Sequence, residues 1–429
     1  MKKLALHGGS PIKLDSFPSW PVFDSREIDA AKSVIESGHW WRYSFGHGLD
    51  YHFKEGEDPS NVAQFQREFA AYQGVKYALA CNNGTTALDI LLKALDIGPG
   101  DEVIVPGYTY VAGVTCVLQV NAVPIFVDVD PNTYNIDPKK IEKAITDRTA
   151  AIVLCHFGGQ MADMDAIMRI AKKYKIAVVE DAAHAHGSKW NGQGAGSIGD
   201  GGTFSFQNAK NMTSGEGGLI SVKDPKLADR VESLSWSGRI KGRPWYEFHE
   251  LGWNARMMEV QAALLRVQLT RLENQNETRR KNAAHLTKRL EQVEGIDPMV
   301  IDPRGSHYSV HIYMMRYRPE NFNNLPRAKF LEALNAEGIP AFSGYTHPVY
   351  KNPMFLEKNF YKKGCPVNCG HYPKDIDYQS FAATCPVSER AAEYEAIWLE
   401  HKMFLGPQKD MDDIADAIIK IKENIHELQ

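Results

Sequence analysis

The stretch EVIVPGYTYVAGVTCVLQVNAVPIFVDV, residues 102–129, contains two short apolar runs separated by a helical pattern. EVIVP at 102–106 and PIFVDV at 124–129 are rich in β-branched residues, whereas AGVTCVLQV at 112–120 is typical of a buried helix. Strands that are apolar throughout and alternate with helices form parallel sheets whose two faces are both covered. The stretch therefore predicts an α/β fold with a mainly parallel sheet.

The same alternation continues on both sides of this stretch. Further strands are expected at 77–81, 150–157, 176–181, 202–207 and 218–222, and further helices at 85–95, 138–145 and 164–174. Ligands of such sheets bind at the carboxyl ends of the strands, so residues that directly follow the strands are the first candidates for a site.

A second region begins after a long helical pattern at 254–293. It contains HYSVHIYMMRY, RAKFLEALNAEG and a final helix over about 410–427, which together predict a smaller αβ domain. We place the boundary near residue 285, which gives a large domain over 1–285 and a small C-terminal domain over 286–429. The polar, Gly-rich stretch 42–62 is interpreted as an insertion, either a functional loop or a surface excursion.

Composition excludes several classes of protein. The 49 Lys and Arg nearly balance the 53 Asp and Glu, so the net charge of −4 gives no reason to expect binding to nucleic acid or to an anionic membrane. No apolar run approaches the roughly 18 residues of a membrane span. The six cysteines are too sparse for a disulfide scaffold, which favours a reducing, cytoplasmic location.

The motif CNNGTTALDILLKAL, residues 81–95, begins at the end of a predicted strand. We expect Thr85 or Thr86 to cap the apolar helix that follows. Free N–H groups and hydroxyls at a helix N-terminus suit a phosphate group. Taken alone, such a motif is more often an ordinary connection between a strand and a helix.

Two further motifs also follow predicted strands. In VVEDAAHAHGSKWNG, residues 178–192, Asp181 ends an apolar strand, and a buried carboxylate there needs a cationic partner that the neighbouring sequence lacks. In TFSFQNAKNMTSGEGGLISV, residues 203–222, Lys210 lies between two strands, where partial burial would lower its pKa and favour attack on a carbonyl. Each alone could be structural. An anion site, a carboxylate and a lysine together match the phosphate, ring nitrogen and aldehyde of pyridoxal 5'-phosphate.

A cluster of possible metal ligands lies near the C-terminal end. Cys365, Cys369 and His371 have the spacing C-x3-C-x-H, which is not a standard zinc pairing. We therefore predict no metal site, and what the cluster binds, if anything, is left open.

Taken together, these motifs resemble the DegT/DnrJ/EryC1/StrS aminotransferases, pyridoxal-phosphate enzymes with the type I, aspartate-aminotransferase-like fold. Within the family, the closest resemblance is to scyllo-inosose aminotransferases and 3-amino-5-hydroxybenzoate synthases. The resemblance covers nearly the whole chain and rests on LHGGSPI, SGHWWR, NNGTTAL, DEVIVPGYTYVA, HFGGQMADMDAI, EDAAHAHGS, FSFQNAKNMTSGEGG, LGWNARMMEVQAA and CPVSERAAEYEAIWL.

The resemblance implies a role for each site residue. Lys210 would be the Schiff-base lysine and Asp181 the partner of the pyridinium nitrogen. His184 stands where most sugar aminotransferases have Gln, and it would contact the cofactor's 3-hydroxyl. The remaining residues implied to bind the cofactor are Gly84, Thr85 and Ser205 at the phosphate, Tyr110 stacked on the ring, and Asn254 at the phosphate of the other subunit.

The activity implied is ping-pong transfer of an amino group from Glu, Gln or another donor to a keto-sugar or keto-cyclitol, in a homodimer with shared active sites. Two alternatives stay open: a dehydratase or aromatase like 3-amino-5-hydroxybenzoate synthase, and a broad-range transaminase of amines or amino acids. Substrate contacts are suggested for Arg256, His347 and the N-terminal Trp40, Trp41 and Arg42, each of which could equally be structural.

Overall fold

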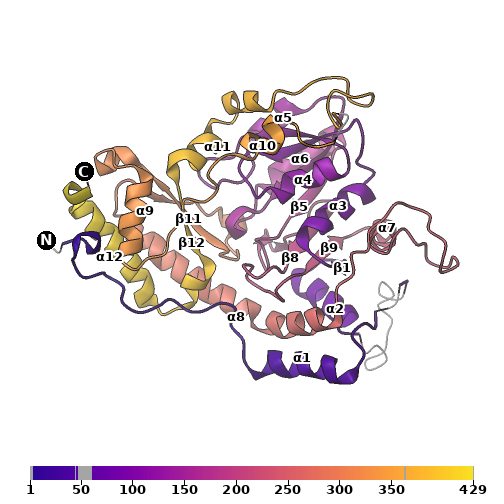
Figure 1. Ribbon diagram of the computed structural model, residues 1–429, viewed down its shortest axis with the longest axis horizontal. Helices are drawn as coiled ribbons and strands as arrows, with labels where there is room; N and C mark the ends of the chain where they lie inside the picture. Colours follow the sequence, from indigo (N-terminus) through magenta and orange to yellow (C-terminus); the bar gives the residue numbers. More distant parts are fainter. Residues whose placement is uncertain (1–2, 44, 47–59, 362–363, 429) are drawn as a thin grey trace.

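The computed structural model describes residues 3–43, 45–46, 60–361 and 364–428. Within these residues, the central sheet has seven strands in the order β1-β9-β8-β5-β4-β2-β3 (Figure 1). Neighbouring strands from β8 to β3 are parallel, whereas β9 runs antiparallel to both β1 and β8. The strands are β1 (Tyr77–Cys81), β2 (Glu102–Pro106), β3 (Val123–Val127), β4 (Thr149–Cys155), β5 (Ala177–Asp181), β8 (Gly201–Ser205) and β9 (Gly218–Val222).

All seven predicted strands are present, with each end within two residues of its predicted position, and the predicted α/β class is confirmed. Side chains alternate between the two faces of the sheet: in β2, Val103 and Val105 pack in one hydrophobic cluster and Ile104 in another. Helices α3 (Gly84–Ala94), α4 (Ala112–Gln119) and α7 (Pro225–Ser235) cover the first face, and α2 (Asn61–Gln73), α5 (Pro138–Ala144), α6 (Met164–Tyr174) and part of α8 (Glu259–Leu290) cover the second.

Helix α8 is shorter than the predicted helical stretch 254–293. Residues before Glu259 are extended instead, because their backbone is paired elsewhere: Asn254 forms a β-bridge with Trp236, and the carbonyl of Ala255 accepts the N–H of Asn82. Helices α1 (Ser25–Ser37), α2 and α7 were not predicted. The predicted loop 42–62 lies largely outside the described residues, and its last two residues begin α2.

A smaller antiparallel sheet follows α8 and carries helices α9 (Arg327–Ala336) and α12 (Gln408–Glu423). Its strands are β10 (Ile296–Pro298), β11 (Ile312–Tyr317) and β12 (Ala396–Glu400). Strand β12 was not predicted from the sequence. The domain boundary expected near residue 285 falls inside α8 and stays a prediction. No helix among the described residues is long and apolar enough to cross a membrane.

The N-terminal segment packs against the small sheet's helices, and Figure 1 shows both termini beside α9 and α12. Leu4 belongs to the same hydrophobic cluster as α12. The carboxylate of Glu337 is fully buried and accepts hydrogen bonds from the N–H groups of Ala5 and Ile12 at 2.9 and 3.1 Å. It also forms an ion pair with Lys420 at 2.8 Å. This one carboxylate therefore joins the first residues of the chain to the C-terminal region.

We expect Glu337→Ala to lower the free energy of unfolding by about 3 kcal/mol, because it leaves the buried ammonium group of Lys420 without its partner. Urea denaturation followed by circular dichroism measures the change. Glu332→Ala, which removes an exposed carboxylate from α9, the helix that ends directly before Glu337, is the matched control. Equal stabilities of the two variants would show that Glu337 is not a structural anchor.

Candidate active site

The predicted site residues meet at the carboxyl edge of the central sheet. Strand pairing places Cys81, Gly218 and Ser205 side by side, and in the same way Cys155, Asp181 and Thr203. Because the residues that follow these strands emerge at the same edge, Gly84, Asp181 and Ser205 are brought together although 121 residues separate the first from the last.

Helix α3 begins at this edge, and its cap differs from the prediction. The cap residue is Asn83, whose Oδ1 accepts the N–H of Thr86 at 2.8 Å, so neither Thr85 nor Thr86 caps the helix. The helix starts one residue earlier than predicted, and both threonines lie in its first turn. The cap bonds the N–H of Thr86. The N–H groups of Gly84 and Thr85, which have no partner within the helix, remain available to a ligand.

Gly84 and Ser205 form a tight cradle. A Cβ atom at position 84 would lie 2.7 Å from the Cβ of Ser205 and 3.3 Å from its hydroxyl oxygen. Only glycine allows the helix N-terminus to approach the end of β8 so closely. Two unused N–H groups and a hydroxyl beside them at a helix N-terminus fit a phosphate.

Asp181 ends β5 and is 5% exposed. Its carboxylate accepts one hydrogen bond, at 3.0 Å, from the N–H of Ala183, and it forms no ion pair within the described residues. Burial raises the pKa of Asp181, and the charges of Lys210 and His156 oppose this rise. A buried carboxylate with one hydrogen bond lacks a cationic partner, and a protonated ring nitrogen would supply it.

Lys210 follows β8 in a turn in which its N–H donates to the carbonyl of Gln207 at 2.9 Å. Burial lowers the pKa of Lys210, whereas the charge of Asp181 acts in the opposite direction. The lysine amine and the Asp181 carboxylate therefore influence each other without forming a salt bridge. A lowered pKa increases the fraction of neutral amine, which is the nucleophilic form.

The residue after the lysine was missed by the sequence analysis. Asn211 is 1% exposed, and its amide donates to the carbonyl of Val310 at 3.2 Å while its oxygen bonds Nδ1 of His311 at 2.9 Å. These bonds tie the lysine loop to the chain that enters β11. No local pattern predicts them, because the partners are about 100 residues apart in sequence.

His184 is buried beside this contact. Its ring lies 4.1 Å from that of His311, which stacks in turn on His401 at 5.7 Å, and we call these three the histidine column. Nδ1 of His184 accepts the N–H of Gly158 at 3.4 Å. Burial lowers the pKa of all three well below the ordinary value, and Lys210 lowers it further. The column is therefore neutral at physiological pH.

Two pockets border the site. One, of about 490 Å³, is lined by Asn208 and Ala209 of the lysine loop, by His311 and by Trp398. Trp20 also lines it, and the indole N–H donates to the carbonyl of Asn208 at 2.8 Å. The other, of about 340 Å³, contains the predicted ring-stacking residue Tyr110, which is half exposed, together with His347 and Tyr345.

Asn254, Trp41 and Arg256 lie beside β1. Leu79 and Ala80 of that strand line the pocket of Trp41 and Arg256, and the carbonyl of the residue after Asn254 accepts the N–H of Asn82, two positions before Gly84.

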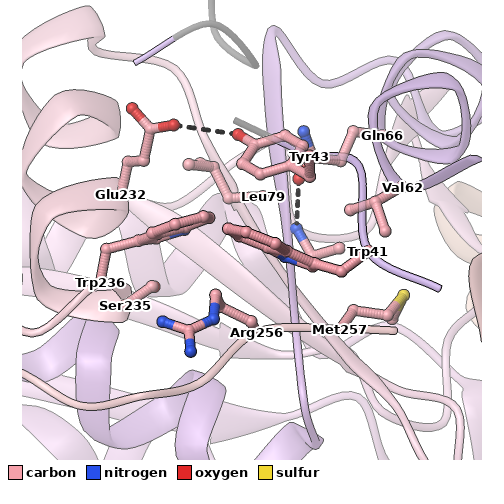
Figure 2. A pocket seen from close by; sticks show the side chains of 11 residues that line it. Trp41, Tyr43, Val62, Gln66, Leu79, Glu232, Ser235, Trp236, Arg256 and Met257 are labelled. Atoms are coloured by element: carbon pink, nitrogen blue, oxygen red, sulfur yellow. Dashed lines mark hydrogen bonds between the residues drawn. The ribbon is translucent and has the colours of Figure 1, made fainter. Parts of the chain in front are cut away.

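The guanidinium of Arg256 lies over the rings of Trp236 and Trp41, at 5.0 and 5.7 Å, in the small pocket of Figure 2. Figure 2 also shows Tyr43 donating to the carboxylate of Glu232, at 3.0 Å. The side chain of Asn254 is exposed.

No group of three or more His, Cys, Asp or Glu side chains in the described parts of the chain is arranged to hold a metal ion. Cys365, Cys369 and His371 thus do not form such a cluster.

The fold is an α/β fold in which this edge of the sheet carries a lysine amine and a buried carboxylate that influence each other. The DegT/DnrJ/EryC1/StrS aminotransferase family model matches residues 54–387. The chain is 37% identical to L-glutamine:2-deoxy-scyllo-inosose aminotransferase of Streptomyces paromomycinus, covering 98% of this chain and 97% of that one. It is 34% identical to 3-amino-5-hydroxybenzoate synthase of Amycolatopsis mediterranei, covering 95% and 99%.

A crystal structure of 3-amino-5-hydroxybenzoic acid synthase matches with a TM-score of 0.81 at 32% identity, covering 97% of this chain and all of that one. The protein belongs to the DegT/DnrJ/EryC1/StrS aminotransferase family. The family and the fold predicted from the sequence motifs are thereby confirmed.

The histidine column makes stability depend on pH. Its members are neutral in the folded protein and have pKa values near 6.5 when unfolded, so protonation of the unfolded chain destabilises the fold as pH falls below about 6.5. We expect His311→Asn to make this acid-side loss shallower by up to about 1.4 kcal/mol per pH unit, the contribution of one proton. Urea denaturation at a series of pH values between about 5 and 8, on both sides of the histidine pKa, measures how the free energy of unfolding changes with pH.

The exposed His39→Asn variant is the control and should keep the slope of the wild-type protein. A slope for His311→Asn that equals the slope of this control would mean that His311 is not held neutral.

Proposed function

We propose that this protein is a pyridoxal-phosphate-dependent aminotransferase that transfers an amino group from L-glutamine or glutamate to a keto-cyclitol or keto-sugar. The observation that carries the proposal is the meeting of three features at one sheet edge: the cradle of Gly84 and Ser205, the buried carboxylate of Asp181 without an ion pair, and the amine of Lys210 with its lowered pKa. The names of the relatives support the substrate class.

Each part of the site has a task in this proposal. The N–H groups of Gly84 and Thr85 and the hydroxyl of Ser205 would bind the phosphate, and Asp181 would keep the ring nitrogen protonated. Tyr110 would cover one face of the ring, and His184, which is buried and neutral, would contact the 3-hydroxyl. When bound, pyridoxal phosphate supplies the electron sink that stabilises negative charge at the substrate carbon.

Lys210 performs the proton transfer. Lys210 would hold the cofactor through its aldehyde group, and its free amine would accept the proton from the α-carbon of the amino donor. The same amine returns a proton in the reverse half-reaction, when the ketone of the acceptor is aminated. A lowered pKa favours this task, because the amine must be neutral to accept a proton.

A second candidate is an aromatising dehydratase like 3-amino-5-hydroxybenzoate synthase, which the 34% identity and the TM-score of 0.81 support. Loss of an α-proton followed by loss of a β-hydroxyl would use the same lysine. Two incubations separate the candidates. With L-glutamine and 2-deoxy-scyllo-inosose, formation of a 2-oxoacid together with an aminated cyclitol supports amino transfer. With an amino-substituted β-hydroxy cyclohexenone, formation of an ultraviolet-absorbing aromatic product supports the synthase.

Lys210→Ala should abolish 2-oxoacid formation while leaving a folded protein that still takes up pyridoxal phosphate, because the phosphate and ring contacts remain. Activity is measured with L-glutamine and the keto-cyclitol, and uptake by equilibrium dialysis. Lys226→Ala, at an exposed position in α7, is the control. Near wild-type turnover by Lys210→Ala would refute the proposed mechanism.

We also propose that the active enzyme is a homodimer in which Asn254 reaches the phosphate bound by the other subunit. The exposure of Asn254 supports this, as does the exposed apolar surface on the same connection: Tyr246 and Leu251 are more than 80% exposed and Trp245 about half. A phosphate held by Gly84, Thr85 and Ser205 has oxygen atoms left that an amide can bond.

Asn254→Ala should therefore weaken cofactor retention by about 1–3 kcal/mol, the value of a lost hydrogen bond to a charged group. Mixing it with Lys210→Ala under subunit exchange should restore activity at limiting cofactor, because one site of each heterodimer then carries neither defect. Mixtures that stay as inactive as the separate variants, or a wild-type enzyme that sediments as an active monomer, would contradict the shared site.

A further inference from the structure

The two cysteines of the C-x3-C motif differ from the other cysteines in their exposure. Cys81, Cys116, Cys155 and Cys385 are buried, whereas Cys365 and Cys369 are both partly exposed. The proposed transamination uses neither of them. They lie between α10 (Pro353–Leu356) and the short helix η6 (Tyr378–Ala383), far in sequence from the lysine loop.

The segment that carries them is fixed to the edge of the central sheet. Val367 and Tyr372 are almost fully buried against Val123 of the edge strand β3. The hydroxyl of Tyr372 donates to the carboxylate of Glu102 at 2.7 Å. The two cysteines therefore stand on an anchored loop, which holds them in a defined relation to each other.

The two thiols lie close enough for each to shift the pKa of the other. The thiol of Cys369 also donates to the carbonyl oxygen of Pro366 at 3.5 Å. A disulfide S–S bond is about 2.05 Å long, so the sulfur atoms must still approach each other. Gly364 and Gly370 flank the two cysteines, and the wide range of backbone angles open to glycine allows this approach.

The surroundings make the two thiols unequal. The backbone N–H groups of Tyr372 and His371 and the thiol of Cys365 stabilise a thiolate at Cys369 and lower its pKa. The same contact raises the pKa of Cys365, because a second negative charge beside Cys369 is unfavourable. An exposed cysteine of low pKa next to a second cysteine is the arrangement found in redox-sensitive pairs.

A metal does not account for the pair. The part of the chain that the structure describes contains no third His, Cys, Asp or Glu side chain grouped with the two thiols to hold a metal ion.

We propose that Cys365 and Cys369 form a reversible dithiol–disulfide site that is oxidised by a low-molecular-weight disulfide such as oxidised glutathione. The Cys369 thiolate attacks one sulfur of the oxidant, forming a mixed disulfide and releasing one glutathione thiolate. Cys365 then loses its proton and attacks the sulfur of Cys369, which releases the second glutathione. The two cysteines lose two protons and two electrons, and the oxidant is reduced to two thiols.

The test is carried out on the folded, full-length protein with oxidised glutathione. A chromogenic thiol reagent should titrate two thiols before oxidation and none afterwards, and dithiothreitol should restore both. Peptide mass spectrometry should find one bond between Cys365 and Cys369. Cys365→Ser/Cys369→Ser, which keeps the four buried cysteines, is the control and should titrate none in either state.

The single variants test the assigned order of attack. Cys365→Ser should retain glutathione as a stable mixed disulfide at Cys369, because no second thiol is left to displace it. Cys369→Ser should react more slowly, because Cys365 lacks the backbone N–H groups of Tyr372 and His371 that stabilise a thiolate at Cys369. Two thiols that remain titratable after oxidation, a disulfide that forms only between chains, or equal rates for the two variants would overturn the proposal.

Discussion

Strands β5 and β8 are buried on both faces, so the central sheet can present polar groups to a ligand only where its strands end. The register of β9 between β1 and β8 brings the N-terminus of α3 against Ser205, and the parallel pairing of β5 with β8 sets Asp181 beside the start of the lysine loop. The positions of the phosphate cradle, the carboxylate and the amine thus depend on the backbone hydrogen bonds that pair these neighbouring strands.

The lysine loop has a second constraint, which comes from the small sheet. Asn211 bonds both Val310 and His311, and Trp20 bonds the carbonyl of Asn208, so residues on both sides of Lys210 are fixed by distant segments. The pocket of about 490 Å³ is lined by the same segments. A shift of the small sheet relative to the large one would therefore move the loop that holds the amine and, at the same time, change the shape of the pocket.

This division explains what could be predicted from the sequence. The strands, Asp181 and Lys210 belong to local patterns, because an apolar run and the polar residue at its end are neighbours in sequence. The contacts of Trp20 and His311 with the lysine loop span about 188 and 100 residues, and no periodicity records them. The cap of α3 was assigned to the threonines rather than to Asn83, because all three residues favour caps and only the backbone geometry distinguishes them.

The charges at the site need a ligand to complete them. Burial raises the pKa of Asp181 and lowers that of Lys210, so the protein environment disfavours the charged form of each, and no salt bridge joins them. A direct salt bridge would stabilise the ammonium form of the lysine and remove its nucleophile. A cationic ring nitrogen beside Asp181 would instead stabilise the carboxylate and leave the amine neutral. The separation of the two groups is therefore as much a part of the proposed chemistry as their presence at one edge.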